Sequence, residues 1–244
     1  KYKKLIMGES KIEWTEKTWN TVTGCNKVSA GCKNCYAEVL AKELQQKGVY
    51  AYRNGFDITL HEERLIQPYK WEPSVVFVNS MSDFCHKDIP EEHVQKLFAV
   101  MNDTPQHIYQ LLSKRTEELL QLNKKLNWTP NIWMGVSVEN EEAKFRIDDL
   151  RQCDAKVKFI SAEPLLADLG EVNLFGIDWV IIGGESGLNA RPMKPEWVQS
   201  LGKQCQDQNV AVFFKQWGII SNNPDPRDPT AKYGHSSKAK GGCM

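Results

Sequence analysis

Short runs of β-branched and aromatic residues alternate along this chain with longer amphipathic segments. Six runs predict strands, at Val75–Ser80, Ile108–Ser113, Ile132–Val138, Lys158–Ala162, Trp179–Gly183 and Ala211–Lys215. A seventh strand is expected within Thr18–Thr23. Strands that are apolar on both faces and alternate with helices form parallel sheets covered by helices. The alternation therefore predicts an α/β fold.

The segments between the strands have the pattern of helices. They are Glu91–Met101, Thr116–Leu126, Asn140–Leu150 and Pro195–Gln206. Apolar residues recur at helical spacing in the first three, and the last begins with proline, a favoured first helical residue.

Side chains able to act as acids, bases or ligands follow each of the six strands. They lie at 79–83, 113–115, 137–140, 161–163, 184–186 and 215–217. In (β/α) barrels the loops after the strands form the face that carries the active site. A simpler explanation is that strand ends are polar because loops are polar. Turn chemistry alone, however, would favour Gly, Asn and Pro at these positions. We therefore expect a full or partial TIM-like (β/α) barrel with parallel strands rather than an open sheet.

The length of 244 residues suits one domain, which we place at 12–218 between an extension at 1–11 and an irregular tail at 219–244. With 31 basic and 31 acidic residues, the chain lacks the excess charge of a protein that coats nucleic acid, although a local basic site stays open. No apolar run approaches the roughly 20 residues of a membrane span, and no secretion signal is found. A cytoplasmic protein with no membrane partner is expected.

Three of the seven cysteines form a C-x6-C-x2-C pattern at Cys25, Cys32 and Cys35, in a loop at 23–36. Thiolates are soft ligands that suit zinc and iron–sulfur clusters. A structural zinc ion takes four ligands, whereas three cysteines with no nearby histidine fit a [4Fe–4S] cluster with one open iron. The glycines at 24 and 31 would let the loop wrap tightly.

Two other interpretations of the cysteines remain open. One is a zinc site completed by Cys85, His86 or a remote residue. The other is a disulfide with one free thiol, which a reducing compartment disfavours. No role is assigned to Cys85 or Cys243.

The cysteine loop after the first strand resembles that of the radical S-adenosylmethionine (SAM) superfamily, in which three cysteines hold a [4Fe–4S] cluster. The whole chain is similar to a family of phage and prophage proteins placed beside those enzymes. The similar stretches are Thr23–Glu38, Phe77–Phe84, Leu112–Arg115, Met134–Asn140, Ser161–Leu166, Ile177–Met193 and Phe213–Gly218. One departure is the first cysteine gap, which has six residues where the superfamily usually has three.

The resemblance implies a [4Fe–4S] cluster and SAM as cofactors, and an electron donor as a partner. It implies that Ser80, Ser82 and Asp83 approach the amino group of SAM and that Lys114 or Arg115 holds its carboxylate. The full set of residues expected to bind the cofactor is Ser80, Ser82, Asp83, Lys114, Arg115, Ser137, Gly183 and Gly184. The residues expected to bind ribose or act on the substrate are Glu139, Glu163, Glu185 and Lys215.

These polar residues have a structural interpretation too. Lys114, Arg115 and Arg191 would then form ion pairs inside the barrel with Glu139, Glu163 and Glu185, and Gly183–Gly184 would be only a turn.

Two functions follow for the chain. The first is a radical SAM enzyme that makes a 5′-deoxyadenosyl radical and acts on an unknown substrate. Cations near the strand ends indicate an anionic partner, such as a nucleotide or nucleic acid; they are Lys114, Arg115, Arg191, Lys194 and Lys215. The second is a binding protein without catalysis, stabilised by zinc or a cluster, whose polar rim binds nucleic acid or protein.

Overall fold

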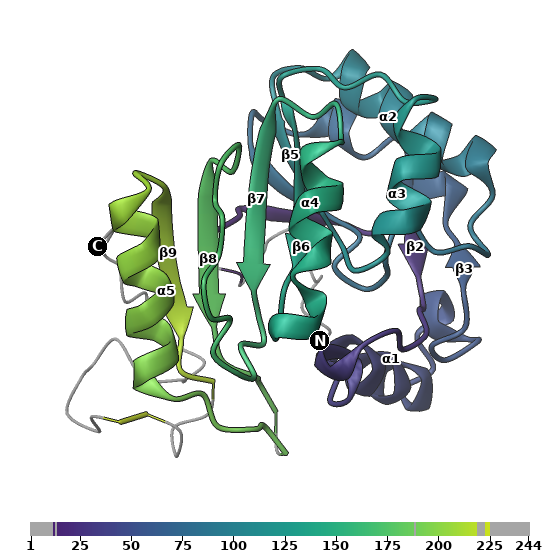
Figure 1. Ribbon diagram of the computed structural model, residues 1–244. Helices are drawn as coiled ribbons and strands as arrows, with labels where there is room; N and C mark the ends of the chain where they lie inside the picture. The colour runs from purple at the N-terminus through teal and green to yellow at the C-terminus, as the bar shows by residue number, and fades with distance from the viewer. Residues whose placement is uncertain (1–11, 13, 188, 219–222, 225–244) are drawn as a thin grey trace.

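A curled sheet of seven parallel strands forms a half-barrel at the centre of the protein (Figure 1). The computed structural model describes residues 12, 14–187, 189–218, 223 and 224. The strands are β1 (Lys17–Trp19), β4 (Val75–Val78), β5 (Ile108–Ser113), β6 (Ile132–Ser137), β7 (Val157–Ala162), β8 (Trp179–Gly183) and β9 (Ala211–Gln216). They lie in the sheet in the order in which they occur in the chain, and every neighbouring pair is parallel. The prediction of a partial (β/α) barrel is confirmed.

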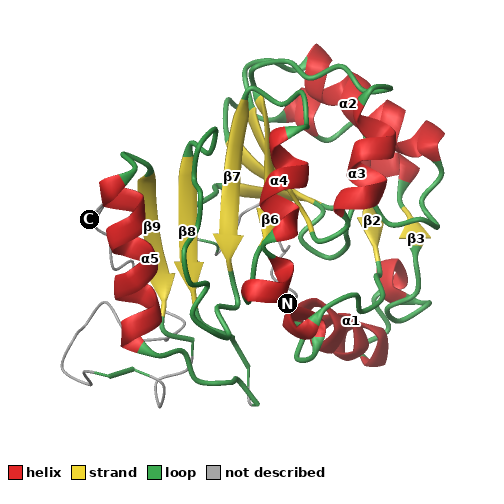
Figure 2. Cartoon of the chain, viewed as in Figure 1, coloured by secondary structure: helices red, strands yellow, loops and turns green. Residues whose placement is uncertain are grey.

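Helices cover the outer face of this sheet (Figure 2). The α-helices are α1 (Tyr36–Gln46), α2 (Glu91–Asp103), α3 (Thr116–Asn123), α4 (Phe145–Arg151) and α5 (Pro195–Asp207). Single 3₁₀ turns lie at Ala30–Cys32 (η1), Tyr50–Tyr52 (η2), Glu62–Arg64 (η3), Pro68–Lys70 (η4) and Glu141–Ala143 (η5). Helix α4 packs on β6 and β7, and α5 packs on β9. None of the helices in the described ranges has the length and apolar character needed to cross a bilayer.

The sequence placed the strands well, and its differences from the structure have local causes. The stretch expected to be one strand at Thr18–Thr23 is β1 followed by β2 (Val22–Thr23), which pairs antiparallel with β3 (Thr59–Leu60). The chain turns there because Asn79 Oδ1 accepts the backbone N–H groups of Thr21 and Val22, at 3.2 and 3.3 Å. The predicted extension at 1–11, and all of the predicted tail at 219–244 except residues 223 and 224, lie outside the described residues.

The helix expected at Asn140–Leu150 is divided into η5 and α4. The side chain of Asn140 accepts a hydrogen bond from the backbone N–H of Ala143, which starts η5. Helix α1 has no counterpart among the predicted helices.

Aromatic rings fill the concave side of the half-barrel. Phe159 and Trp179 stack at 4.9 Å, and Trp14 meets Phe77 edge-on at 4.8 Å. Side chains alternate between the faces of a strand, so Phe159 points away from Ile160, which packs in the main core that includes the helices. Gly135 gives the Phe159 ring its space, because a Cβ there would lie 2.3 Å from a ring carbon. We call these rings the aromatic layer (Trp14, Phe77, Trp133, Phe159 and Trp179). The layer lies nearer the amino ends of the strands than the polar residues at their carboxyl ends.

Candidate cofactor site

The cysteine loop (residues 24–35) lies at the carboxyl ends of the strands. Gly24 forms a parallel bridge with Ser82, just after β4, and its N–H donates to the carbonyl of Met81 at 3.0 Å. Ser82 Oγ donates to the carbonyl of Gly24 at 2.7 Å. Helix α1 follows the loop, at the end of the molecule toward which the arrowheads of β7, β8 and β9 point (Figure 1). The loop therefore starts where the sequence placed it, on the face where a (β/α) barrel carries its active site.

Gly24 is required for the loop to leave the sheet. Its φ of +97° is unfavourable for other residues, and a Cβ would lie 2.2 Å from the carbonyl oxygen of Asp57. Gly31 has a different role, because a Cβ there would lie 3.1 Å from the carboxylate of Glu139. The two glycines thus let the loop approach its neighbours closely, as the sequence indicated.

The three thiols of the loop are free and partly exposed. Burial and the charge of Asp83 raise the pKa of Cys25, although Arg115 acts in the opposite direction. Arg115 Nη2 lies 3.9 Å from Cys25 Sγ. Cys35 is the N-cap residue of α1. The donor set thus has the chemistry of a soft-metal site that solvent can reach.

In the part of the chain that the structure describes, no three Cys, His, Asp or Glu side chains are gathered tightly enough to bind one metal ion. A [4Fe–4S] cluster makes a different demand, because each of its thiolates binds a separate iron. Three free cysteines on one short loop supply the thiolates that such a cluster would need.

Glu139 follows β6 and is fully buried. Its Oε2 accepts a hydrogen bond from Arg146 Nη1 at 2.8 Å, and its Oε1 accepts the backbone N–H of Gly31 at 3.2 Å. Burial alone would raise the pKa of Glu139, but Lys114 and Arg146 outweigh it and lower the pKa. Glu139 therefore carries a negative charge directly beneath the cysteine loop.

Glu185 follows β8 and holds the same loop from another strand. Its Oε2 accepts Asn34 Nδ2, the backbone N–H of Arg191 and Arg191 Nε, each at 2.9 Å. Arg191 Nη2 in turn donates to the carbonyl of Ala30 at 3.0 Å. Burial opposes ionisation of Glu185, but the hydrogen bonds from Arg191 and Asn34 prevail and lower its pKa.

Asp83 anchors the end of β5, and Arg115 contacts the start of the loop. Asp83 accepts the Ser113 hydroxyl at 2.8 Å and the backbone N–H of Lys114 at 3.0 Å, and it lies 3.9 Å from Arg115 Nε. Arg115 Nη2 donates to the Asn26 carbonyl at 3.2 Å and to the Asn26 side chain. Of these two residues expected to bind SAM, Asp83 thus connects the segment after β4 to the end of β5, and Arg115 connects that end to the cysteine loop.

A second polar group lies on the concave side, above the aromatic layer. Lys215 on β9 is paired with Glu163 at the end of β7, and Lys114 Nζ donates to Ser137 Oγ at 2.9 Å. Lys215 and Glu163 are both about one-fifth exposed. Ser80 is turned toward Asn20, to which its hydroxyl donates at 3.1 Å.

The two glycines at the end of β8 pack closely against neighbouring groups. A Cβ at Gly184 would lie 2.2 Å from the carbonyl of Trp217, and one at Gly183 would lie 3.3 Å from the carboxyl carbon of Glu163. Gly184 is therefore needed for packing against the backbone, whereas a side chain at Gly183 would require the Glu163 side chain to move slightly.

The structure brings most of the predicted site residues to one edge of the sheet. Their carboxylates form ion pairs, of which only Glu185–Arg191 belongs to the structural interpretation. Glu185 pairs with Arg191, Glu163 with Lys215, and Glu139 with Arg146. The sequence did not single out Arg146, Asn34 or Asn26. Arg146 is one of several cations on a predicted helix, and the two asparagines are ordinary loop residues.

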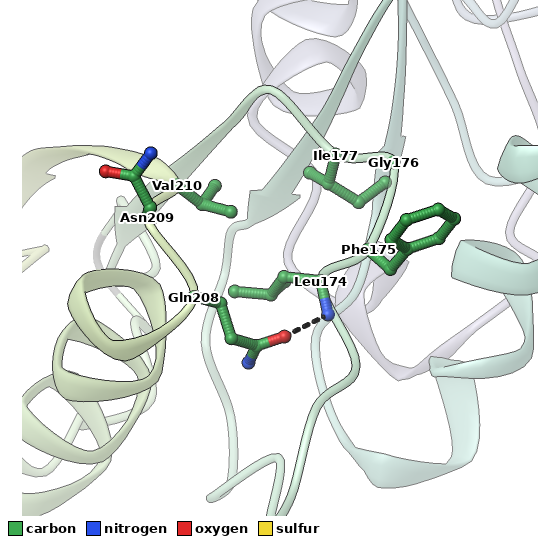
Figure 3. Close-up of a pocket in the computed structure, with 7 residues that line it drawn as sticks. All are labelled: Leu174, Phe175, Gly176, Ile177, Gln208, Asn209 and Val210. Carbon is green, nitrogen blue, oxygen red and sulfur yellow. Dashed lines mark hydrogen bonds between the residues drawn. The ribbon is translucent and has the colours of Figure 1, made fainter.

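A surface pocket of about 370 Å³ lies at the opposite edge of the sheet, before β8 and β9 (Figure 3). It is lined by Leu174, Phe175, Gly176, Ile177, Gln208, Asn209 and Val210. The Gln208 side chain closes one wall by accepting the Leu174 N–H at 2.8 Å. The pocket has no charged residue in its lining and is remote from the cysteines, so it does not belong to the candidate site.

Comparisons with known proteins agree with this architecture. The model of the family described as "Protein of unknown function (DUF5131)" matches residues 9–241. Spore photoproduct lyase complexed with dinucleoside spore photoproduct is similar in structure, with a TM-score of 0.50, 11% identity, and coverage of 86% of this chain and 68% of the lyase. A mutant of that lyase with the same dinucleoside has a TM-score of 0.48 and 11% identity over 83% of this chain, which spans 64% of the mutant's length. No curated protein matches the chain.

The likeness to the lyase shows the fold. The chain shares with that lyase a curled parallel sheet with helices on its outer face.

Proposed function

The chain belongs to the DUF5131 family, and we propose that it is a radical SAM-type enzyme whose [4Fe–4S] cluster is held by Cys25, Cys32 and Cys35. One observation carries the proposal: the three free, partly exposed cysteines share a loop at the carboxyl edge of a parallel half-barrel. When bound and reduced, the cluster supplies the electron that cleaves SAM to methionine and a 5′-deoxyadenosyl radical.

The residues around the loop have roles that follow from their charge and position. Arg115 presents a cation next to the loop and Lys114 presents one at the end of β6, and both are suited to the carboxylate of SAM. Asp83 and the Ser82 hydroxyl are suited to its ammonium group. Ser137 orients the Lys114 ammonium. Gly183 and Gly184 leave the end of β8 without side chains, where an adenine or ribose could approach.

Glu163 and Lys215 are proposed to face the substrate. They form a half-buried pair on the concave side, directly above the aromatic layer, so a proton could be held or passed there away from bulk water. The anionic class of substrate, a nucleotide or nucleic acid, is supported by Lys114, Lys215 and Arg191 near the strand ends. A dinucleoside is the ligand of the structurally similar lyase. An electron donor is required as a partner.

The proposal is tested by anaerobic reconstitution of the full chain, followed by measurement of iron and sulfide and incubation of the reduced protein with SAM. We expect about four irons per chain and release of 5′-deoxyadenosine. Cys32→Ala should abolish both, whereas Cys205→Ala, which changes a buried thiol on α5, should abolish neither.

One zinc ion and no iron in the wild-type protein would overturn the proposal in favour of a metal-stabilised binding protein. A full cluster without 5′-deoxyadenosine would overturn the catalytic part alone.

A further inference from the structure

Two carboxylates from different strands meet the middle of the cysteine loop. Glu139 accepts the backbone N–H of Gly31, and Glu185 accepts Asn34 Nδ2 and orders Arg191 against the carbonyl of Ala30. We propose that Glu139 and Glu185 are positioning residues, which together form a clamp that sets the shape of the cysteine loop and acts on the cluster only through that loop.

The hydrogen bonding of the two carboxylates leaves them poorly placed to act on a substrate. Both oxygens of Glu139 already accept charged or backbone donors, and the residue is fully buried. Glu185 is 4% exposed, and one of its oxygens accepts three hydrogen bonds. A carboxylate so engaged is held in its ionised form and gains little by accepting a further proton. The expected catalytic roles of these two residues are therefore replaced by a positioning role.

The clamp also accounts for the unusual spacing of the cysteines. The clamp contacts the loop at Ala30 and Gly31, in the turn η1 (Ala30–Cys32), and at Asn34. Ala30 and Gly31 are the last two of the six residues between Cys25 and Cys32. A longer gap between two cysteines gives the loop more conformational freedom, and ordering the loop then costs more entropy. The hydrogen bonds with the residues after β6 and β8 offset that cost. Gly31 completes the contact, because its missing Cβ leaves room for the Glu139 carboxylate.

The relevance of this clamp to catalysis rests on the proposed cluster, but its effect on the loop does not. The first experiment therefore needs no metal. Rates of alkylation by iodoacetamide are measured at each cysteine of the apo-protein by mass spectrometry. The variants are Glu185→Gln, Glu139→Gln and Asn34→Ala, and the matched control is Asp178→Asn, whose carboxylate accepts the backbone N–H of Lys158 at the other edge of the sheet, at 2.7 Å.

Asn34→Ala is included because it removes the link to Glu185 from the loop side and leaves the buried Glu139–Arg146 pair intact. If Glu139→Gln fails to fold, Asn34→Ala and Glu185→Gln decide the question. We expect alkylation of Cys25, Cys32 and Cys35 to rise about tenfold in the clamp variants, because a lost hydrogen bond to a charged group shifts local opening by about that factor. The buried Cys153 and Cys205 should keep their wild-type rates, since the rest of the fold is unchanged.

The second experiment compares electron paramagnetic resonance spectra of the reduced, reconstituted proteins. The clamp variants should bind less iron or show altered g values, and Asp178→Asn should match the wild type. Glu139→Asp, which keeps the charge on a shorter side chain, should restore part of the wild-type spectrum.

Three outcomes would overturn the inference. Unchanged alkylation rates in the variants would show that the carboxylates do not set the loop, and equal increases at Cys205 would show a general loss of stability. Faster alkylation of the loop cysteines together with a wild-type electron paramagnetic resonance spectrum would show that the clamp does not act on the cluster. Absence of iron from the wild type would count against the proposed function, while the alkylation rates would still decide whether the clamp exists.

Discussion

The two ends of the half-barrel are held by different kinds of interaction. Toward the amino ends of the strands, the concave side is filled by stacked and edge-on aromatic rings, with Phe159 fully buried against Trp179. Toward the carboxyl ends, carboxylates such as Glu139 and Glu185 collect hydrogen bonds from the cysteine loop. We infer from this difference that ring packing stabilises the end of the half-barrel at the amino ends of the strands. The carboxyl ends can therefore carry charged groups and partly exposed thiols.

The largest expected effect is at the aromatic end. Phe159→Ala should lower the free energy of unfolding by about 3 to 5 kcal/mol, because it removes a fully buried ring that contacts Trp14 and Trp179. Denaturant titration measures this loss, and iron content of the folded fraction should stay at the wild-type level. A loss below about 1 kcal/mol would contradict the assignment of stability to this end.

The next effect concerns acid. His61 is buried, with Nε2 2.9 Å from the hydroxyl of Thr23, the residue before the cysteine loop. Burial lowers the pKa of His61 to about 4. The His pKa in the unfolded chain is about 6.5. Between about pH 4 and pH 6.5 the unfolded chain therefore binds a proton at this residue, whereas the folded chain does not. This contribution to stability is complete above about pH 6.5 and is lost, by up to about 3 kcal/mol, as the pH falls to about 4.

The measurement is denaturant unfolding at several pH values for the wild type and for His61→Gln. Titration of the carboxylates affects both proteins, so the difference between their plots of unfolding free energy against pH isolates the contribution of His61. The same dependence on pH in both proteins would show that the strand before the cysteine loop does not depend on a neutral histidine.

A smaller effect sharpens the comparison by adding one methyl group. Gly135→Ala should cost about 1 to 3 kcal/mol, because its Cβ would lie 2.3 Å from the Phe159 ring. The matched control is Gly202→Ala on α5, where a Cβ meets no atom within 4 Å and the change should stabilise the helix by up to about 1 kcal/mol. If both variants had the same stability in thermal unfolding, the aromatic layer would not be closely packed.

The smallest effect is expected at the rim of the pocket before β8 and β9. Phe175 is 80% exposed there, so Phe175→Ser should change the free energy of unfolding by no more than about 0.5 kcal/mol. Denaturant titration beside Phe159→Ala checks this result. A loss comparable to that of Phe159→Ala would place the stability of the amino end at its surface instead of in its aromatic layer.

The sequence predicted the sheet because most of its strands are short runs of mainly β-branched, aromatic and other apolar residues. β5 and β8 have the predicted bounds, Ile108–Ser113 and Trp179–Gly183. Helix α1 was not predicted, although Ala37, Leu40, Ala41 and Leu44 recur in it at helical spacing. Only the small residues Ala37 and Ala41 are buried, while Val39 and Leu40 are exposed.

The candidate site was predictable in its residue types and its edge of the sheet, but not in its partnerships. Four of the six strand ends offered a carboxylate, and any of several cations could have paired with it. Glu185 binds Asn34 across 151 positions of sequence, and Gly31 meets Glu139 across 108. Such pairs depend on how the loop folds back over the strands, which no local pattern encodes.

The order of the strands has a consequence for how the protein is made. Because the sheet follows the chain, each new strand leaving the ribosome can pair with the one completed before it, from β4 through β9. The cysteines are synthesised early, then Glu139, and finally Glu185 with Arg191. During translation the cysteine loop is thus synthesised well before Glu139 and Glu185. Until these residues are made, the middle of the loop lacks the hydrogen bonds that hold it in the folded protein.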